Sequence, residues 1–155
     1  MGFGSLSIKG RALRYLAQRE HSRAELERKL SRAVQDQPLA SARAQIGAAL
    51  DELAAQGLLS EARTAQSVLD SQGRRFGTRR LRQTLQSKGL APELVAGMLQ
   101  QARLTELERA REVWRRRFGR PPADAAERAR QMRFLAGRGF ESDIIRRVVA
   151  GADDE

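Results

Sequence analysis

The stretch Leu85–Leu90, LQSKGL, returns fifty positions later as Leu135–Phe140, LAGRGF. Each copy joins the apolar end of a helical pattern to a basic residue, a glycine and a second amphipathic segment. A basic residue suits the negative C-terminal end of a helix, and glycine accepts the left-handed backbone that closes it. The repeated stretch therefore predicts a turn between two helices that is used more than once along the chain.

The surroundings of this turn repeat as well. Weaker copies begin at Leu16 and Leu53, and Arg74–Gly77, RRFG, reappears as Arg116–Gly119 at the end of another helical pattern. Internal repeats of this length indicate units that lean on their neighbours. The sequence therefore predicts an all-α fold built from tandem repeats of a three-helix unit, with about nine helices.

Helical periodicity and turn residues divide the chain into segments. The expected segments are a flexible N-terminus at 1–7, three-helix units at 8–58, 59–103 and 104–151, and an acidic tail at 152–155. No stretch alternates between apolar and polar residues at period two, so no sheet is expected.

Two pairs of residues have the spacing of a capping box, in which a Ser or Thr side chain and a Glu three residues later cap a helix start. They are Ser22 with Glu25 and Thr105 with Glu108. The second pair predicts that one helix ends near Ala102 and that another begins at Thr105.

The amino-acid composition limits the partners and the reactions to be expected of this chain. The 155 residues include 29 basic and 19 acidic side chains, for a formal net charge of +10, and there is no cysteine. The excess of positive charge favours polyanionic or acidic partners. The only histidine, His21, precedes a predicted helix start, and a surface or capping role is expected for it. No catalytic residue, metal site or cofactor is expected, and the protein is not expected to be an enzyme.

No apolar run has the length of a signal peptide or of a membrane-spanning helix. A cytoplasmic location without membrane contact is the expectation.

The basic residues are unevenly placed. Between Ser71 and Pro92 there are several arginines and a lysine but no acidic residue. With Leu81 and Leu85 turned inward on a short helix, Arg79 and Arg82 must face solvent or a partner. A second basic group surrounds Trp114 and Phe118, which fall on an apolar stripe and are expected to pack in the core. The candidate binding residues are Arg74, Arg75, Arg79, Arg82, Lys88, Arg115, Arg116, Arg117 and Arg120.

Several stretches, taken in order, resemble the RecX family of regulators of the bacterial recombinase RecA. These stretches are 12–16, 19–26, 29–30, 57–59, 77–83, 85–89, 133–135, 138–140 and 144–148. The sequence departs from the family pattern after Gly57. There the family tends to have acidic residues followed by an aromatic–alanine pair, whereas residues 60–65 of this chain, SEARTA, contain one acid and no aromatic residue.

The resemblance implies tandem three-helix units in an elongated, curved molecule without a catalytic site. It also implies binding in the groove of the filament that RecA forms on single-stranded DNA, with inhibition of ATP hydrolysis, strand exchange and co-protease activity in recombination and the SOS response. The expected partners are RecA and single-stranded DNA, with double-stranded DNA as a further candidate, and the expected state is a monomer. Arg138 and Phe140 match a family motif, but we interpret them as a helix-end cation and a core aromatic residue.

Two other functions stay open at this point. Helix pairs joined by tight turns also occur in helix-turn-helix proteins, so a stand-alone DNA-binding protein is the main alternative. A scaffold that binds another acidic protein is the third. Affinity for duplex DNA without RecA would favour the DNA-binding alternative, and the salt dependence of binding would separate phosphate contacts from protein contacts.

Overall fold

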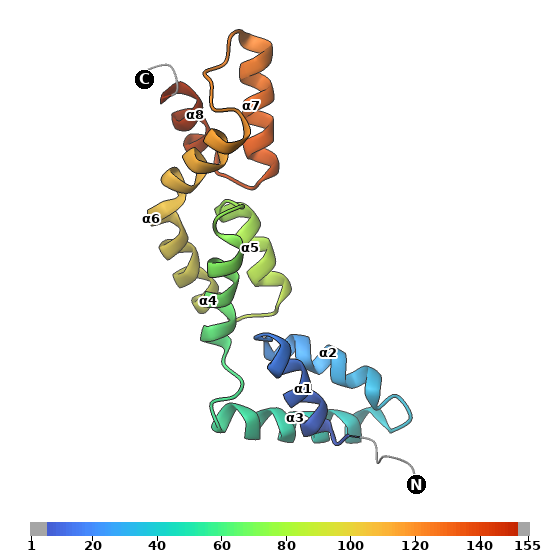
Figure 1. Cartoon of the computed structure of the whole chain (residues 1–155). Helices are drawn as coiled ribbons and strands as arrows, with labels where there is room; N and C mark the ends of the chain where they lie inside the picture. The colour runs from blue at the N-terminus through green and yellow to red at the C-terminus, as the bar shows by residue number, and fades with distance from the viewer. Residues whose placement is uncertain (1–5, 152–155) are drawn as a thin grey trace. The chain divides into compact units, whose positions relative to one another are not determined.

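The structure, a computed structural model, describes residues 6–151, and this part of the chain forms eight α-helices and no strand (Figure 1). The helices are α1 (Ile8–Gln18), α2 (Arg23–Ala33), α3 (Leu39–Ala55), α4 (Glu61–Gln72), α5 (Thr78–Ser87), α6 (Pro92–Arg117), α7 (Ala125–Gly137) and α8 (Ser142–Gly151). The all-α prediction is confirmed. Most of the predicted flexible N-terminus and the whole acidic tail lie outside the described residues.

The described residues form two compact units. The first contains residues 6–65 together with 88–90, and the second contains 66–87 together with 91–151. In the first unit α1, α2 and α3 pack on one another. In the second unit α5 packs on α6, and α6, α7 and α8 pack on one another. The division into three-helix units at residues 58 and 103 stays a prediction.

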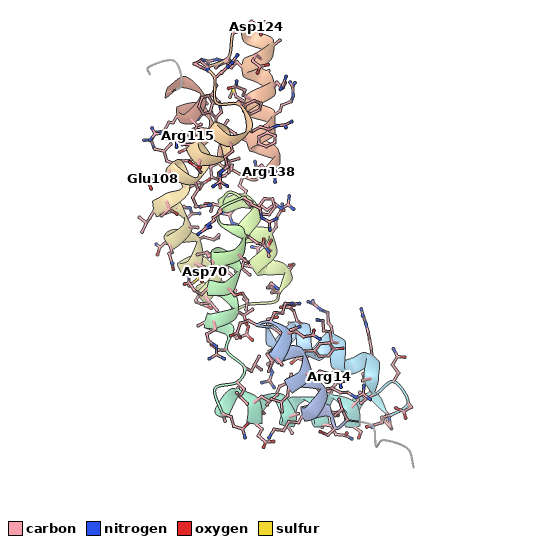
Figure 2. All side chains as sticks on the ribbon, viewed as in Figure 1. Arg14, Asp70, Glu108, Arg115, Asp124 and Arg138 are labelled. Atoms are coloured by element: carbon pink, nitrogen blue, oxygen red, sulfur yellow. The ribbon has the colours of Figure 1, made fainter. Side chains whose placement is uncertain are left out.

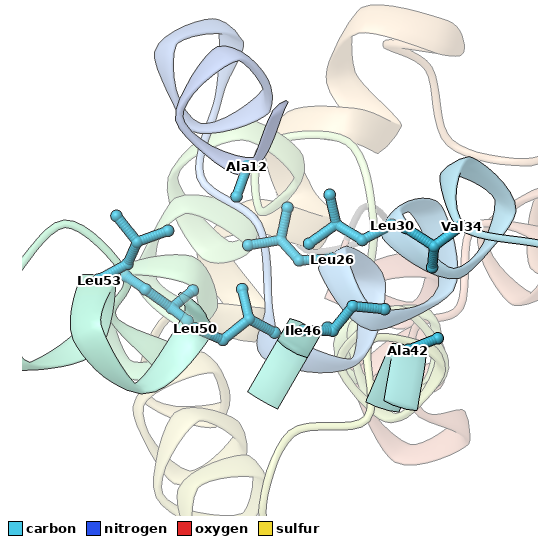
Figure 3. Close-up of a cluster of buried hydrophobic side chains, with 9 residues drawn as sticks. Ala12, Leu26, Leu30, Val34, Ala42, Ile46, Leu50 and Leu53 are labelled. Atoms are coloured by element: carbon cyan, nitrogen blue, oxygen red, sulfur yellow. The ribbon is translucent and has the colours of Figure 1, made fainter. Parts of the chain in front are cut away.

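The core of the first unit follows the apolar stripes of its helices. Leu26 and Leu30 lie one turn apart on α2, and Ile46, Leu50 and Leu53 lie along one face of α3. Figure 3 shows these side chains converging with Ala12 of α1. Burying one such side chain contributes about 1.5–3 kcal/mol, so the spacing of these residues explains both the helices and their packing.

One hydrophobic cluster of the second unit is centred on Phe140, which is completely buried among side chains from α6, α7 and α8. Trp114 packs against this cluster, and its indole N–H donates to Oε1 of Gln131 at 2.8 Å. The expectation that Trp114 and Phe140 pack in the core is confirmed. Phe118, expected on the same stripe as Trp114, is half-buried and packs edge-on against Phe134, with 5.4 Å between the ring centres.

The helix boundary expected near Thr105 was wrong. α6 runs without interruption from Pro92 to Arg117, so Thr105 and Glu108 lie inside a helix and cap nothing. Residues 99–117 contain neither glycine nor proline, and most of them are good helix formers, so nothing ends the helix there. The two helices expected on either side of Thr105 are one, and this accounts for eight helices in the described residues.

His21 is also placed differently from the expectation, because its side chain is completely buried. Its Nδ1 lies 3.0 Å from the carbonyl oxygen of Arg19, and its Nε2 lies 2.8 Å from Nζ of Lys29. Because an ammonium group only donates, Nε2 must accept and Nδ1–H must donate to the carbonyl. Burial lowers the pKa of His21, and the positive charges of Arg19 and Lys29 add to this effect.

The capping box at the start of α2 is confirmed. Oγ of Ser22 accepts from the N–H of Glu25 at 3.1 Å, and Oε1 of Glu25 accepts from the N–H of Ser22 at 3.1 Å.

Candidate functional site

Two repeated motifs meet in the second unit. The N–H of Gly77 donates to the carbonyl oxygen of Arg138 at 2.9 Å, and the N–H of Arg79 donates to that of Gly139 at 2.9 Å. A Cβ atom on Gly77 would lie 2.4 Å from Cα of Phe140. The loop between α4 and α5 thus packs directly on the turn between α7 and α8, and we call this contact the glycine junction, defined by Gly77, Arg79, Arg138 and Gly139.

Gly139 contributes to the junction in a second way. Its φ is +86°, in the left-handed region that favours glycine, and a Cβ atom there would lie 2.4 Å from Cβ of Arg80. The junction therefore has no room for a side chain at either glycine, and it fixes the backbone on which Arg138 is carried.

A buried carboxylate reinforces this arrangement. Glu106, in the middle of α6, accepts from the hydroxyl of Thr78 and, through Oε1, from the N–H of Glu141 at 2.9 Å. Thr78 begins α5 and Glu141 immediately precedes α8, so one carboxylate satisfies donors at two helix starts, where negative charge is favoured.

Arg109 holds the end of α4 from the same face of α6. Its guanidinium donates to the carbonyl oxygens of Gly73 and Phe76, at 2.7 Å each, and to that of Ala102 at 2.8 Å. Burial lowers the pKa of Arg109, while nearby Glu106 raises it. Neither Glu106 nor Arg109 was singled out in the sequence, because each is one charged residue among many on a helix.

Several arginines make cation–π contacts with two phenylalanine rings close to the junction. The guanidinium carbons of Arg80 and Arg75 lie 4.1 and 5.1 Å from the centre of the Phe76 ring. Those of Arg138 and Arg117 lie 5.1 and 5.2 Å from the centre of the Phe134 ring. Arg138 also lies 5.8 Å from the centre of Phe76. Its guanidinium is therefore associated with both aromatic rings.

Three of these arginines, Arg75, Arg117 and Arg138, border a hollow of about 280 Å³, which we call the arginine pocket. Its walls come from the α4–α5 loop, the C-terminal part of α6 and the end of α7. The lining residues are Arg74, Arg75, Val113, Arg116, Arg117, Phe134 and Arg138. Figure 2 labels Arg138, at the end of α7, and Arg115 on α6. The pocket is rich in guanidinium groups and has no acidic residue in its lining.

The structure thus brings four of the nine candidate residues into one place, namely Arg74, Arg75, Arg116 and Arg117. The other candidates lie apart from it. Arg79 is exposed and Arg82 half-buried on α5, and Arg120 is exposed after α6. Arg115 pairs with Glu112 at 2.9 Å, and Arg116 shares that carboxylate at 3.1 Å. Exposed pairs of this kind contribute little free energy and leave the side chains free to rearrange.

Lys88 differs from the other candidates because its ammonium is engaged within the first unit. Its Nζ lies 3.0 Å from Oε1 of Glu25, and its carbonyl oxygen accepts from Oγ of Ser22. Burial raises the pKa of Glu25, but hydrogen bonds from Arg19, from the N–H of Ser22 and from Lys88 outweigh burial and hold that pKa at about 2. The sequence does not indicate this pair, since Glu25 lies 63 residues from Lys88.

In the described part of the chain, no group of three or more histidine, aspartate and glutamate side chains is arranged to hold a metal ion. None of the helices in residues 6–151 has the length and apolar character needed to cross a membrane.

Comparison with known proteins identifies the family. A family model described as "RecX, third three-helix domain" matches residues 105–149. The chain is 57% identical over 150 residues to the regulatory protein RecX of Leptothrix cholodnii, a match that covers 97% of this chain and 92% of the relative. It is 46% identical over 148 residues to the regulatory protein RecX of Ralstonia nicotianae, covering 96% of this chain and 89% of the relative.

A solved structure shares the fold at low sequence identity. The crystal structure of RecX from Lactobacillus salivarius matches with a TM-score of 0.74 and 19% identity, covering 96% of each chain. Identities of 57% and 46% over nearly the whole chain show common family membership and not only a shared fold. Both of these relatives are regulatory proteins RecX. The chain therefore belongs to the RecX family of regulatory proteins.

Proposed function

We propose that this protein is a non-enzymatic modulator, chiefly an inhibitor, of the recombinase RecA. It acts in the cytoplasm as a monomer, binds in the groove of the filament that RecA forms on single-stranded DNA, and lowers ATP hydrolysis, strand exchange and co-protease activity. The observation that carries the proposal is the 57% identity to a RecX regulatory protein over nearly the whole chain.

The charge distribution of the second unit supports this proposal. Arg74, Arg75 and Arg79 are exposed on or next to the α4–α5 loop. Within residues 6–151 none of these three side chains forms an ion pair with a carboxylate. Positive charge that is not neutralised internally attracts a polyanion and accelerates its association. We therefore assign electrostatic contact with the filament to this loop and to α5, and we leave out Lys88 because Glu25 already engages it.

The test is ATP hydrolysis by RecA on single-stranded DNA, titrated with this protein. We expect inhibition by the wild-type chain and a higher half-inhibitory concentration for the double variant Arg79→Ala, Arg82→Ala. The stability of this variant should stay within about 0.5 kcal/mol of wild type, as is usual for surface positions. Alanine keeps the backbone N–H of Arg79, so the glycine junction is preserved.

A matched control is available on α6, where Arg103 and Arg111 are also exposed. The double variant Arg103→Ala, Arg111→Ala loses the same charge and should inhibit like wild type. Unchanged inhibition by the Arg79/Arg82 variant, or an equal loss in the control, would contradict the assignment. Absence of any effect of the wild-type chain on RecA, combined with tight binding to duplex DNA, would favour a stand-alone DNA-binding protein.

A further inference from the structure

We propose that the arginine pocket binds phosphate groups of a single nucleic-acid strand, with Arg138 as its central contact. The inference rests on the proposed function and deepens it by naming the part of a RecA–DNA filament that the second unit recognises. It also reassigns Arg138, which the sequence indicates only as a cation at a helix end.

The first argument is how the arginines are held. Arg138 and Arg117 lie over the Phe134 ring at 5.1 and 5.2 Å from its centre. A cation–π contact attracts the guanidinium group to the ring without taking up its N–H groups in an ion pair. The contact therefore helps to order these side chains without neutralising their charge, whereas pairing with a carboxylate would occupy the N–H groups.

The second argument is the absence of competing acids. In the described part of the chain, Arg74, Arg75, Arg117 and Arg138 form no ion pair with a carboxylate, and only Arg116 does so among the arginines of the pocket.

Three larger hollows elsewhere in the chain each include a carboxylate. Asp70 lines one of about 450 Å³, Asp124 and Glu127 line one of about 590 Å³, and Glu27 lines one of about 690 Å³. The arginine pocket differs from these three because its lining contains cations and no acid.

The third argument concerns the shape of the ligand. The arginines that line the pocket come from three elements, the α4–α5 loop, α6 and the end of α7, so they can approach a bound group from several directions. The tetrahedral oxygens of a phosphate can accept from several directions at once, whereas a planar carboxylate is satisfied by one or two forks. A flexible single strand can adapt its backbone to place a phosphate in a hollow of about 280 Å³, whereas bending the stiffer backbone of a duplex into it costs free energy.

The glycine junction explains why Arg138 is in place to do this. Its carbonyl oxygen accepts from the N–H of Gly77, and the following residue, Gly139, accepts from Arg79. The backbone of Arg138 is therefore tied to the α4–α5 loop that contributes Arg74 and Arg75, and the pocket walls are fixed relative to one another within the second unit.

The experiment measures binding of the full chain to a fluorescent oligothymidylate, without RecA, by anisotropy over a series of salt concentrations. Arg138→Gln should weaken binding about tenfold, the effect of losing one or two charge-assisted hydrogen bonds. It should also flatten the slope of log affinity against log salt by roughly 0.7, the value for one phosphate contact on a single strand. Arg117→Gln is a second variant of the same pocket and should act in the same direction.

Two controls sharpen the reading. Arg111→Gln removes the same charge from an exposed position on α6 outside the pocket, and its affinity should stay within about twofold of wild type. Arg138→Lys keeps the charge but lacks the planar fork, so it should restore the salt slope more than the affinity. Far-UV circular dichroism of each variant verifies that the unit is folded.

The binding experiment tests the phosphate site independently of RecA inhibition. Affinity of Arg138→Gln and Arg117→Gln equal to that of Arg111→Gln would overturn the phosphate site, and so would a wild-type chain that does not bind the oligonucleotide. If such a chain still inhibits RecA, the proposed function survives and only the pocket assignment fails. If the pocket variants weaken oligonucleotide binding as predicted while the wild-type chain has no effect on RecA, the pocket assignment survives and the proposed function fails.

Discussion

Replacing Gly77 by alanine should destabilise the second unit by about 3 kcal/mol or more. The new Cβ would lie 2.4 Å from Cα of Phe140 and 2.5 Å from the carbonyl oxygen of Gly139. Both are backbone atoms that cannot rotate away, so the α4–α5 loop must move off the α7–α8 turn. Two backbone hydrogen bonds are then lost, at roughly 1–3 kcal/mol each when a buried donor is left without a partner. Displacement of Phe140, which is completely buried, adds to this cost.

Thermal unfolding followed by far-UV circular dichroism measures the effect. For a unit of this size each kcal/mol shifts the midpoint by about 4–8 °C, so we expect a decrease of about 12 °C or more in the transition of the second unit. Gly97→Ala is the matched control, because that position lies inside α6 and a Cβ there meets no atom within 4 Å. It should raise stability by about 0.5–1 kcal/mol. A Gly77→Ala variant within 0.5 kcal/mol of wild type would refute the close packing of the two motifs.

Three further predictions follow from buried charged and titratable groups. Glu106→Gln should lower the free energy of unfolding by about 2 kcal/mol, because the amide replaces one acceptor by a donor beside Thr78 and the N–H of Glu141. In a double-mutant cycle with Thr78→Val the two effects should not add. Additive effects would show that the two side chains do not interact. Burial lowers the pKa of His21, so below about pH 6.5 the unfolded chain binds a proton more readily than the folded chain. The free energy of unfolding should therefore be constant above about pH 6.5 and decrease as the pH falls below that value. Urea titrations from about pH 8 to 5.5 should show this decrease in wild type and a smaller one in His21→Gln, and equal decreases would contradict the prediction. The pKa of Glu25 is held at about 2, below an unfolded value of 4.5. Its contribution to the free energy of unfolding, about 3 kcal/mol, is therefore present above pH 4.5 and is lost as the pH falls towards 2. Glu25→Gln should remove this acid dependence from the first unit, and an unchanged acid transition would argue against the ion pairs with Arg19 and Lys88.

The sequence was sufficient for much of the fold because the repeated signals are local. The apolar stripe of Leu26 and Leu30, the capping box of Ser22 and the glycine at 139 each act within one or two helical turns, and all three are found where expected. The break expected at Thr105 failed because a Thr-x-x-Glu spacing also occurs inside helices. Only a helix breaker would have ended α6, and residues 99–117 contain none.

The candidate site was predictable only in part, because its geometry depends on contacts between distant residues. The excess of arginine pointed to Arg74, Arg75, Arg116 and Arg117, which do line one pocket. No local pattern indicates that Lys88 pairs with Glu25, because 63 residues separate the two. The stretches RRFG at 74–77 and LAGRGF at 135–140 are visible in the sequence as separate helix ends. Their direct contact through Gly77 and Gly139 depends on how α4, α6 and α7 pack.

The most direct test of the central claim compares the affinity of this protein for RecA filaments on single-stranded DNA with its affinity for the bare strand and for duplex DNA of the same length. Filaments assembled with a non-hydrolysable ATP analogue keep the target constant, and fluorescence of the labelled chain reports binding. We predict the tightest binding to the filament, weaker binding to the bare strand that Arg138→Gln weakens about tenfold further, and the weakest binding to the duplex. Affinity for the duplex that equals or exceeds affinity for the filament would contradict the proposal that this chain is a RecA modulator.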